Sequence, residues 1–321
     1  MKRVLVCGAT GFIGRNIVER FAVRDDIKVI AVYNNRPSYQ LDFDGQIEWV
    51  KADLRNPEDV KRIMKDIDIV IQAAATTSGA KDIVNKPYIH VTDNAVMNSH
   101  LLREAYENKV EHFIFFSCTV MYQSSNRALK EEDWDASQAL HERYFGVGNT
   151  KIYIENMLEF YSRISNMKTT AIRHSNIYGP HDKFDFDRSH VFGATVSKVM
   201  LADKSISVWG TGEEERDLLY VDDIVDFVIA AIKNQKNNYE LYNCGLGKKV
   251  SIRDLVKKVI KHSGKDIEIE YDTSQPTIKT SLYLDNSKAI NDLGWKPMTS
   301  LDDGIKRTLS WWNDNIDPKK L

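Results

Sequence analysis

Three evenly spaced glycines are the first residues whose spacing suggests chemistry. Gly8, Gly11 and Gly14 lie in the segment MKRVLVCGATGFIGR at 1–15, after an apolar run and before an amphipathic stretch. In a strand–turn–helix unit the first glycine permits the turn, the second lets the backbone approach a pyrophosphate, and the third lets the helix pack on the sheet. The helix start then faces the phosphates with its N–H groups. Glycine clusters also form ordinary tight turns, but the strand and helix on either side favour a dinucleotide site.

Composition and charge are those of a globular enzyme-sized chain. The 321 residues are 42% hydrophobic and 28% charged, and 44 basic residues against 46 acidic ones give a net charge of −2. This balance favours neither a nucleic-acid partner nor an anionic membrane. The three cysteines lack metal-ligand spacing, so we expect no metal site and a reducing compartment. No run reaches 18 apolar residues and the first strand leaves no room for a signal peptide, so we expect a cytoplasmic protein.

Apolar runs alternate with amphipathic stretches through the first half of the chain. This alternation predicts a doubly wound parallel α/β sheet of the Rossmann type. Runs such as VIAV at 29–32 do not alternate with polar residues, as expected when helices cover both faces. We expect strands at 3–7, 28–32, 47–51, 68–73, 112–117 and 169–173, and helices at 13–23, 57–65, 95–108 and 151–165.

The pattern loosens after residue 180. We expect a dinucleotide-binding domain at 1–175 and a smaller C-terminal substrate-binding lobe at 176–321, interleaved with the first. The expected elements of the second part are a loop at 182–189, a helix at 191–201, a strand at 206–209, a turn at 210–212, a helix at 222–232, a helix from 251, a strand at 267–271 and a last helix at 301–312.

Motifs along most of the chain resemble those of the extended short-chain dehydrogenase/reductases that modify nucleotide sugars. The resemblance runs from Gly8 to about Trp312. Its pieces are GATGFIG at 8–14, ADLRN at 52–56, QAAA at 72–75, FFSCTVMY at 115–122, TKIYIENM at 150–157, RHSNIYGP at 173–180, RDLLYVDDIV at 216–225 and LGWKPMTSLDDGI at 293–305. The segments at 87–102, 178–191 and 208–223 are most similar to the GDP-L-fucose synthase branch of that family.

The resemblance implies an NAD(P) site. Asp53 is expected to accept a hydrogen bond from the adenine amino group, and a helix-capping role is its alternative. The residues expected to bind the cofactor are Gly8, Gly11, Phe12, Ile13, Gly14, Asn34, Arg36, Asp53, Leu54, Ala73, Ala74, Ala75 and Lys151.

The choice between the two cofactors depends on the residues after the second strand. NAD enzymes of this architecture place Asp or Glu on the ribose 2′-OH, whereas this chain has Tyr33, two asparagines and Arg36. A guanidinium pairs with a phosphate as a bidentate fork, so the segment favours NADP, with NAD as the alternative. A solvated surface arginine is the other interpretation of Arg36.

The expected catalytic tyrosine is missing. The family normally places a tyrosine four residues before a lysine on one helix, where the ammonium lowers the pKa of the phenol that transfers a proton. Lys151 matches this lysine, but Val147 occupies the tyrosine position. Tyr144 is the nearest phenol, and Gly146 and Gly148 predict a broken helix from which it folds back toward Lys151. A tyrosine that only packs at the helix start is the alternative.

The end of the fifth predicted strand departs from the family as well. Cys118 stands where the family has Ser or Thr, and Thr119 follows it. A thiol near Lys151 can act as an acid or a base, whereas an inert buried cysteine is the alternative. The group that replaces the phenol is Tyr144, Cys118, Thr119 or a bound water, with Tyr144 slightly favoured. Val120 after Thr119 argues against 4,6-dehydration, because dehydratases of the family have an Asp-Glu pair there.

Three further residues match family positions near the sugar. His190 matches a histidine that acts as an acid in epimerisation, and Asn176 and Arg216 match residues that hold the nucleotide-sugar phosphates. A surface histidine and a surface ion pair are the alternatives for His190 and Arg216.

These observations lead to one expected function and two alternatives. We expect an NADP-dependent nucleotide-sugar epimerase/reductase that acts through a 4-keto sugar, with a GDP-sugar as the candidate substrate. The alternatives are a C4-epimerase that retains NAD and a cofactor-binding pseudoenzyme. The resemblance also implies a homodimer, formed by the helices at 95–108 and 151–165.

Overall fold

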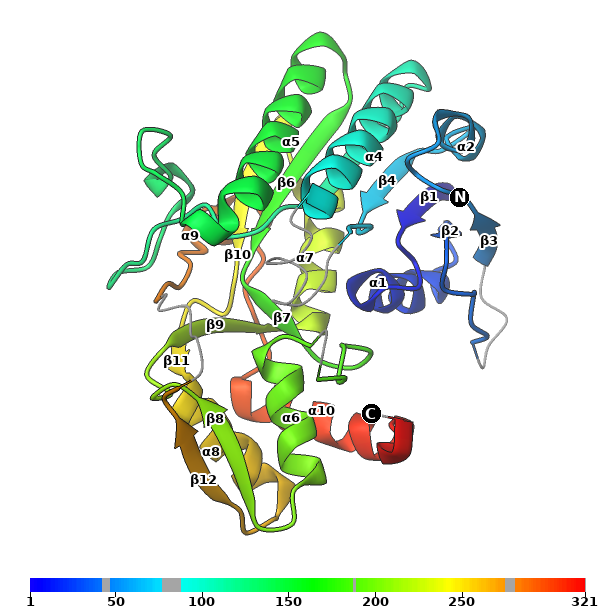
Figure 1. Cartoon of the computed structure of the whole chain (residues 1–321). Coiled ribbons are helices and arrows are strands. Elements are labelled where there is room, and N and C mark those ends of the chain that lie inside the picture. The colour runs from blue at the N-terminus through cyan, green and yellow to red at the C-terminus, as the bar shows by residue number, and fades with distance from the viewer. Residues whose placement is uncertain (42–46, 77–87, 187–188, 275–280, 321) are drawn as a thin grey trace.

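A parallel seven-stranded sheet forms the centre of the upper part of the molecule (Figure 1). This computed structural model describes residues 1–41, 47–76, 88–186, 189–274 and 281–320. Every strand pairing in the sheet is parallel within these ranges, and the order is β10-β6-β5-β4-β1-β2-β3. The strands are β1 (Lys2–Cys7), β2 (Ile27–Tyr33), β3 (Ile47–Lys51), β4 (Ile69–Gln72), β5 (His112–Phe116), β6 (Lys168–His174) and β10 (Tyr239–Cys244).

Helices cover both faces of this sheet. On one face α1 (Phe12–Ala22) and α7 (Val221–Asn234) share an apolar core with the strands. On the other face the core includes residues of α2 (Pro57–Ile63), α4 (Tyr88–Glu107) and α5 (Phe145–Ile164). The predicted doubly wound α/β fold is confirmed. The strand order changes direction at β1, so the carboxyl ends of β1 and β4 form the crevice where such sheets bind ligands.

The seventh strand, β10, comes from a part of the second half of the chain for which the sequence analysis expected no strand. β10 pairs with β6 from Tyr239 opposite Thr169 to Cys244 opposite His174. The chain therefore leaves the sheet after β6, enters the lower lobe and returns to complete the sheet. The expected division at residue 175 stays a prediction, but the two parts are interleaved in this way.

The lower lobe surrounds its own apolar core (Figure 1). Two small sheets, β11-β9-β7 and β12-β8, pack with three helices. The strands are β7 (Asn176–Tyr178), β8 (Ser205–Trp209), β9 (Glu215–Tyr220), β11 (Lys249–Ser251) and β12 (Glu268–Asp272), and the helices are α6 (Val191–Leu201), α8 (Ile252–Ser263) and α10 (Leu301–Asn315). A further helix, α9 (Ser287–Leu293), contributes Leu293 to the core of the upper part.

Capping residues mark the ends of several helices. The side chains of Asn56, Ser251 and Ser300 accept backbone N–H groups in the first turns of α2, α8 and α10. Gly264 ends α8 and Gly294 ends α9 in the left-handed region, which glycine adopts without a Cβ clash.

The largest correction to the expected elements concerns α5. Gly146 and Gly148 were expected to break the helix, but α5 runs through both without interruption from Phe145. A Cβ on Gly146 would lie 2.9 Å from Val91 Cγ2, and one on Gly148 would lie 3.0 Å from Leu140 Cδ1. These glycines therefore allow close packing of the helix start against its neighbours. α4 also begins earlier than expected, at Tyr88.

Candidate cofactor and active site

The turn after β1 has the geometry of a dinucleotide-binding loop. Gly8 has a φ of 75°, and a Cβ there would lie 2.8 Å from Ala74 Cα. A Cβ on Gly14 would lie 2.1 Å from the Gly8 carbonyl oxygen, and the Gly11 N–H donates to that oxygen at 2.9 Å. Only glycine fits at positions 8 and 14, so the start of α1 is held close to the carboxyl edge of the sheet, as a dinucleotide-binding turn requires.

The ends of β1 and β4 are tied together beside this turn. Ala73 N–H donates to the Cys7 carbonyl at 3.2 Å, and Ala74 N–H donates to Gln72 Oε1 at 3.1 Å. Phe12 and Ile13 at the start of α1 pack against the apolar core. The structure thus brings these predicted cofactor residues into one place, and their roles remain predictions.

Asp53 is held by a neighbouring arginine. Arg55 donates to its Oδ1 at 3.0 Å and to its Oδ2 at 2.8 Å, and these hydrogen bonds hold the pKa of the Asp53 carboxyl below its usual value. Asn56, and not Asp53, caps α2, so the alternative role expected for Asp53 is wrong. Leu54 beside it is buried.

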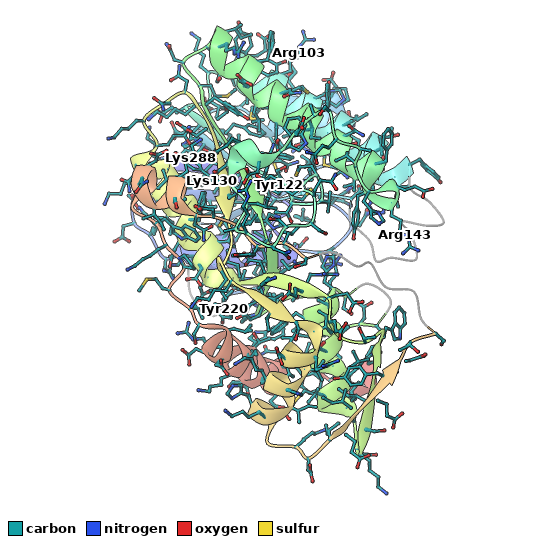
Figure 2. All side chains as sticks on the ribbon, turned by 90° about the vertical axis from the view of Figure 1, so that its left-hand side faces the viewer. Arg103, Tyr122, Lys130, Arg143, Tyr220 and Lys288 are labelled. Atoms are coloured by element: carbon teal, nitrogen blue, oxygen red, sulfur yellow. The ribbon has the colours of Figure 1, made fainter. Side chains whose placement is uncertain are left out.

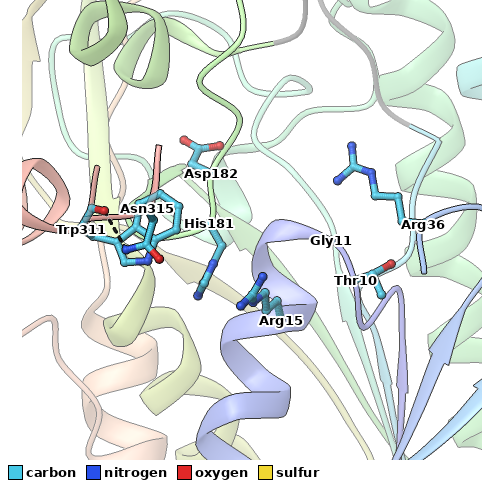
Figure 3. A pocket seen from close by; sticks show the side chains of 8 residues that line it. All are labelled: Thr10, Gly11, Arg15, Arg36, His181, Asp182, Trp311 and Asn315. Carbon is cyan, nitrogen blue, oxygen red and sulfur yellow. Dashed lines mark hydrogen bonds between the residues drawn. The ribbon is translucent and has the colours of Figure 1, made fainter. Parts of the chain in front are cut away.

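A cavity opens at the start of α1 (Figure 3). Its volume is about 320 Å³, and both Arg15 and Arg36 line it. The other lining residues are Thr10, Gly11, His181, Asp182, Trp311 and Asn315, so the wall opposite Arg36 is built by the lower lobe. The sequence analysis included Arg36 but missed Arg15, although a basic residue directly after the third glycine was a visible signal.

Lys151 lies on α5, close to the end of β5. Its Nζ donates to the Phe116 carbonyl at 2.7 Å and lies 4.5 Å from the centre of the Phe115 ring. Burial lowers the pKa of its ammonium, while Cys118 and Glu155 oppose that shift. Lys151 therefore places a positive charge at the carboxyl edge of the sheet, where the site was expected.

A buried network fixes the helix that carries Lys151. Arg173 on β6 donates to both carboxylate oxygens of Glu155, at 3.1 and 2.7 Å. It also donates to the hydroxyl of Tyr122 at 3.0 Å, and that hydroxyl donates to Asn243 on β10 at 2.8 Å. Tyr122 lies inside the protein beside these elements (Figure 2). The network joins α5, β6 and β10, so it is a structural support for the site.

Cys118 lies next to Lys151. Burial raises the pKa of its thiol, and the positive charge of Lys151 partly opposes that increase. The thiol therefore stays protonated at neutral pH. Thr119 follows in a turn, where its carbonyl accepts the Tyr122 N–H at 3.1 Å. Both residues are partly exposed.

Tyr144 directly precedes α5, which is continuous from Phe145 to Lys151 and beyond. The sequence analysis expected a loop here that folds Tyr144 back toward Lys151, and these described residues form a helix instead. Seven residues of helix separate the two along the axis by ~10 Å. Burial raises the pKa of the Tyr144 phenol, and the charge of Arg216 opposes the shift most strongly. Tyr144 therefore lies nearer to the expected phosphate-binding residues than the sequence indicated.

Two histidines lie near the same edge. His190 precedes α6 and is exposed, although the surrounding protein and then the charge of Lys183 lower the pKa of its imidazole. His174 ends β6, and the sequence analysis missed it despite its place after a predicted strand. Burial lowers its pKa to about 4, and Lys151 and His190 act on it in the same direction. The ring is therefore neutral near pH 7.

Asn176 and Arg216 come from neighbouring strands. Asn176 is opposite Leu218 in the parallel pair of β7 and β9, and its Nδ2 donates to the Asp217 carbonyl at 3.3 Å. Arg216 is partly exposed, and one of its terminal nitrogens donates to the Glu215 carbonyl at 2.8 Å. The two predicted phosphate ligands therefore come from adjacent positions in one small sheet.

The described ranges show neither a metal cluster nor a membrane helix. No three His, Cys, Asp or Glu side chains gather there as a metal site would require. No helix among those residues is long and apolar enough to span a membrane.

The fold and this edge of the sheet define a dinucleotide-binding α/β enzyme. Residues 4–245 match the NAD dependent epimerase/dehydratase family, and the chain belongs to that family. It is an NAD(P)-dependent enzyme of the extended short-chain dehydrogenase/reductase type, in a family of nucleotide-sugar epimerases and reductases.

Similar proteins cover nearly the whole chain. A GDP-L-fucose synthase of Azorhizobium caulinodans is 27% identical over 97% of this chain and 96% of its own. A GDP-L-colitose synthase of Yersinia pseudotuberculosis is 26% identical over 97% of both chains. The crystal structure of a UDP-glucose 4-epimerase of Thermotoga maritima with UDP-glucose is 25% identical, with a TM-score of 0.86 over 98% of this chain and 100% of its own.

Proposed function

We propose that this chain is an NADP-dependent epimerase/reductase that acts on a nucleotide sugar through its 4-keto form, with a GDP-sugar as the substrate. The observation that carries the proposal is that Lys151 interacts electrostatically with Cys118 near the end of β5, and that Tyr144 interacts with both Cys118 and Arg216 of the lower lobe. Similarity to a GDP-L-fucose synthase and a GDP-L-colitose synthase supports the choice of substrate.

The residues at the turn fit a dinucleotide. The close approach of Gly14 to Gly8 leaves no space for a Cβ, as expected where the helix must pack closely against the turn of a dinucleotide site. NADPH, when bound, supplies the hydride that reduces the sugar carbonyl. In the proposed mechanism Lys151 holds the nicotinamide ribose and stabilises developing negative charge on the sugar oxygen. A proton must reach that oxygen, and the candidate donors are Cys118, Tyr144, Thr119 and a water.

The sugar nucleotide would extend toward the lower lobe. We infer that Arg216 and Asn176 bind its phosphates, because both are partly exposed on the adjacent strands β9 and β7. His190 would act as the acid during epimerisation, since a histidine changes its charge near neutral pH.

A C4-epimerase that retains NAD is the second candidate. Similarity to the UDP-glucose 4-epimerase of Thermotoga maritima favours it. Such an enzyme oxidises and reduces the same sugar, so it consumes no added NAD(P)H. Net oxidation of NADPH during turnover distinguishes the proposed reductase from this candidate.

We also propose a cytoplasmic homodimer formed by α4 and α5, which lie side by side (Figure 1). Along α5, Tyr153, Phe160 and Ile164 are 49%, 55% and 48% exposed. A face with several exposed apolar side chains of this size is typical of an interface.

The experiment combines a binding screen with turnover. GDP-, UDP-, dTDP- and CDP-linked sugars and their 4-keto forms are tested with NADP(H) and NAD(H), first by thermal shift and then by product analysis. A ligand that binds the native state raises the melting temperature by mass action. We expect the largest shift with NADP(H) and a GDP-sugar, and NADPH oxidation with its 4-keto form. The absence of turnover with every sugar would contradict the proposal.

A variant of Lys151 tests the proposed site. Lys151→Met should reduce kcat by about 10²-fold or more because it removes the charge that stabilises the transition state. The control is Lys65→Met, because Lys65 is an exposed lysine just after α2 and is distant from Lys151 in the sequence. Circular dichroism should show both variants folded. Activity of Lys151→Met within tenfold of the parent would place the active site elsewhere.

A further inference from the structure

The proposed epimerisation needs a base as well as an acid. A base removes a proton from the carbon beside the 4-keto group, and an acid returns a proton to the opposite face of that carbon. His190 is the proposed acid, and no residue has yet been given the role of the base. His174, at the end of β6, is a titratable side chain near Lys151 that the proposed mechanism does not use.

The hydrogen bonding of His174 defines which of its ring nitrogens can accept a proton. Its Nδ1 lies 2.7 Å from the carbonyl oxygen of Ser175. A carbonyl oxygen only accepts hydrogen bonds, so Nδ1 carries the proton of the neutral ring and Nε2 keeps its lone pair. Among the described residues, no hydrogen bond or ion pair engages Nε2. The neutral ring therefore presents an unprotonated and unoccupied nitrogen, as a base must.

This nitrogen is accessible to a ligand. His174 is partly exposed, and its Nε2 is not among the buried atoms of the described ranges that lack a partner. The ring is also held from one side, because it lies edge-on to the ring of Phe116 with 6.1 Å between the ring centres. The hydrogen bond to Ser175 and the contact with Phe116 thus fix the ring, while Nε2 stays free.

His174 and Lys151 approach the same residue from different elements. The Lys151 Nζ donates to the Phe116 carbonyl at 2.7 Å, and Phe116 lies opposite Ile172 in the pair of β5 and β6. His174 therefore follows the strand next to the one that anchors the lysine. Lys151 is proposed to stabilise negative charge on the sugar oxygen, and the carbon that loses a proton is only two bonds from that oxygen. A base for this carbon must lie near Lys151, as His174 does.

His190 faces His174 from the lower lobe. His190 directly precedes α6, whereas His174 ends β6 in the upper part of the molecule (Figure 1). The charge of His190 lowers the pKa of His174, so the two imidazoles interact. Two imidazoles that come from different lobes can act on opposite faces of a sugar bound between them.

The surroundings of His174 keep its ring neutral before a substrate binds. Burial lowers its pKa to about 4, the Ser175 carbonyl opposes that shift, and the charges of Lys151 and His190 add to it. The ring is therefore unprotonated at neutral pH. Negative charge that develops on an enolate favours the imidazolium, because an opposite charge nearby raises the pKa of a histidine. The base is thus available at the start and becomes stronger as the proton moves.

We propose that His174 is the catalytic base of the epimerisation and that its Nε2 removes the proton from the carbon beside the 4-keto group. The proposal rests on the proposed function and adds a residue to it. The C–H bond breaks, its electron pair forms the enolate, and the proton passes to Nε2. A proton from His190 then forms the new C–H bond on the opposite face. Solvent takes one proton from His174 and returns one to His190, so nothing is oxidised or reduced.

The test follows deuterium at the carbon beside the carbonyl. The protein is incubated in D₂O with a GDP-linked 4-keto hexose and with NADP⁺ in place of NADPH, and deuterium is measured by NMR. His174→Asn should slow the exchange by about 10²–10⁴-fold, the usual contribution of a positioned base. Its amide can still donate to the Ser175 carbonyl, so the variant should fold. The matched control is His262→Gln on α8, where His262 binds Asp302 at 2.7 Å, and it should exchange like the parent.

Two further readouts separate a base from a residue that only supports the fold. His174→Asn should lose both exchange and inversion, whereas His190→Asn should lose inversion and keep exchange, because His174 can return a deuteron to the face it attacked. Added imidazole should restore part of the exchange in His174→Ala. NADPH-dependent reduction of the 4-keto sugar should continue in His174→Asn, since the hydride step does not use this base.

Several results would overturn the proposal. Exchange in His174→Asn within tenfold of the parent would show that another group is the base, and loss of exchange in His190→Asn alone would assign that role to His190. Weaker binding of NADPH by His174→Asn, with normal exchange at saturating cofactor, would make His174 a cofactor contact. A parent that reduces the sugar without exchange would remove the epimerisation and this inference with it. A parent that does neither would contradict the proposed function itself.

Discussion

Val147 lies one helical turn before Lys151, and its side chain has no proton to transfer. Of the candidate donors, Cys118 is the one whose charge acts on the Lys151 ammonium. Burial raises the pKa of the Cys118 thiol, so it is protonated at neutral pH, as an acid must be. Tyr144 interacts most strongly with Arg216, on the side where the phosphates are proposed to bind, and more weakly with Cys118. The structure thus shifts the balance from Tyr144 toward Cys118.

We expect Cys118→Ala to lower kcat by about 10²–10⁴-fold, the usual contribution of a positioned general acid. Tyr144→Phe should act mainly on KM, because the phenol would contact the bound sugar nucleotide. Steady-state kinetics with the substrate from the binding screen measure both parameters. Cys118→Ser is the control that keeps an O–H donor, and it should retain part of the activity. A large kcat loss in Tyr144→Phe with none in Cys118→Ala would reverse the assignment.

At the scale of elements, the close contact between α10 and β7 is sensitive to a single methyl group. A Cβ on Gly304 of α10 would lie 2.0 Å from the Tyr178 hydroxyl oxygen. Tyr178 is fully buried and stacks against Phe192 of α6, with 4.0 Å between the ring centres. The tyrosine therefore has little space in which to move.

Gly304→Ala should destabilise the protein by about 1–3 kcal/mol, the usual cost of overpacking. The melting temperature should fall, even though alanine favours helix more than glycine does. Ser310→Ala on the exposed side of the same helix is the control and should leave the melting temperature nearly unchanged. A Gly304→Ala variant as stable as the parent would show that Tyr178 can move away.

Most of the first six sheet strands could be predicted because they contain continuous apolar runs, such as VLVC in β1 and IVI in β4, which the sheet buries on both faces. β10 could not, because its sequence YELYNC includes Glu240 and Asn243, and both are buried. Glu240 pairs with Lys288 at 2.7 Å, and Asn243 accepts a hydrogen bond from Tyr122. Those partners are distant in sequence, so nothing local indicates that the polar residues can enter a sheet.

In the site, too, local motifs could be predicted, whereas features that depend on distant residues could not. The glycine turn and Lys151 could be predicted from local motifs. The continuity of α5 could not, because the space that its glycines occupy is set by Val91 and Leu140. The position of Arg15 depends on Tyr39 in the same way, since the ring under its guanidinium comes from another part of the chain.

At the scale of the whole molecule, the proposed dimer depends on the exposed apolar side of α5. Phe160→Glu places a charge in that surface, and burying an unpaired charge in an interface is costly. We expect the parent to have twice the mass of one chain by size-exclusion chromatography with light scattering, and the variant to dissociate. Lys257→Glu on α8, in the lower lobe, is the control and should stay dimeric. A parent that is monomeric at micromolar concentration would contradict the proposal.

The late position of β10 in the chain has a consequence for synthesis on the ribosome. Until residue 239 emerges, β6 has an unpaired edge, and the nascent sheet must wait while the strands and helices of residues 176–234 are made. An open strand edge invites pairing with other chains. A premature stop between β6 and β10 would therefore release a protein with the whole glycine turn and Lys151, yet with a sheet edge open to aggregation. The strand of the seven-stranded sheet that is synthesised last thus decides whether the residues made before it form a soluble enzyme.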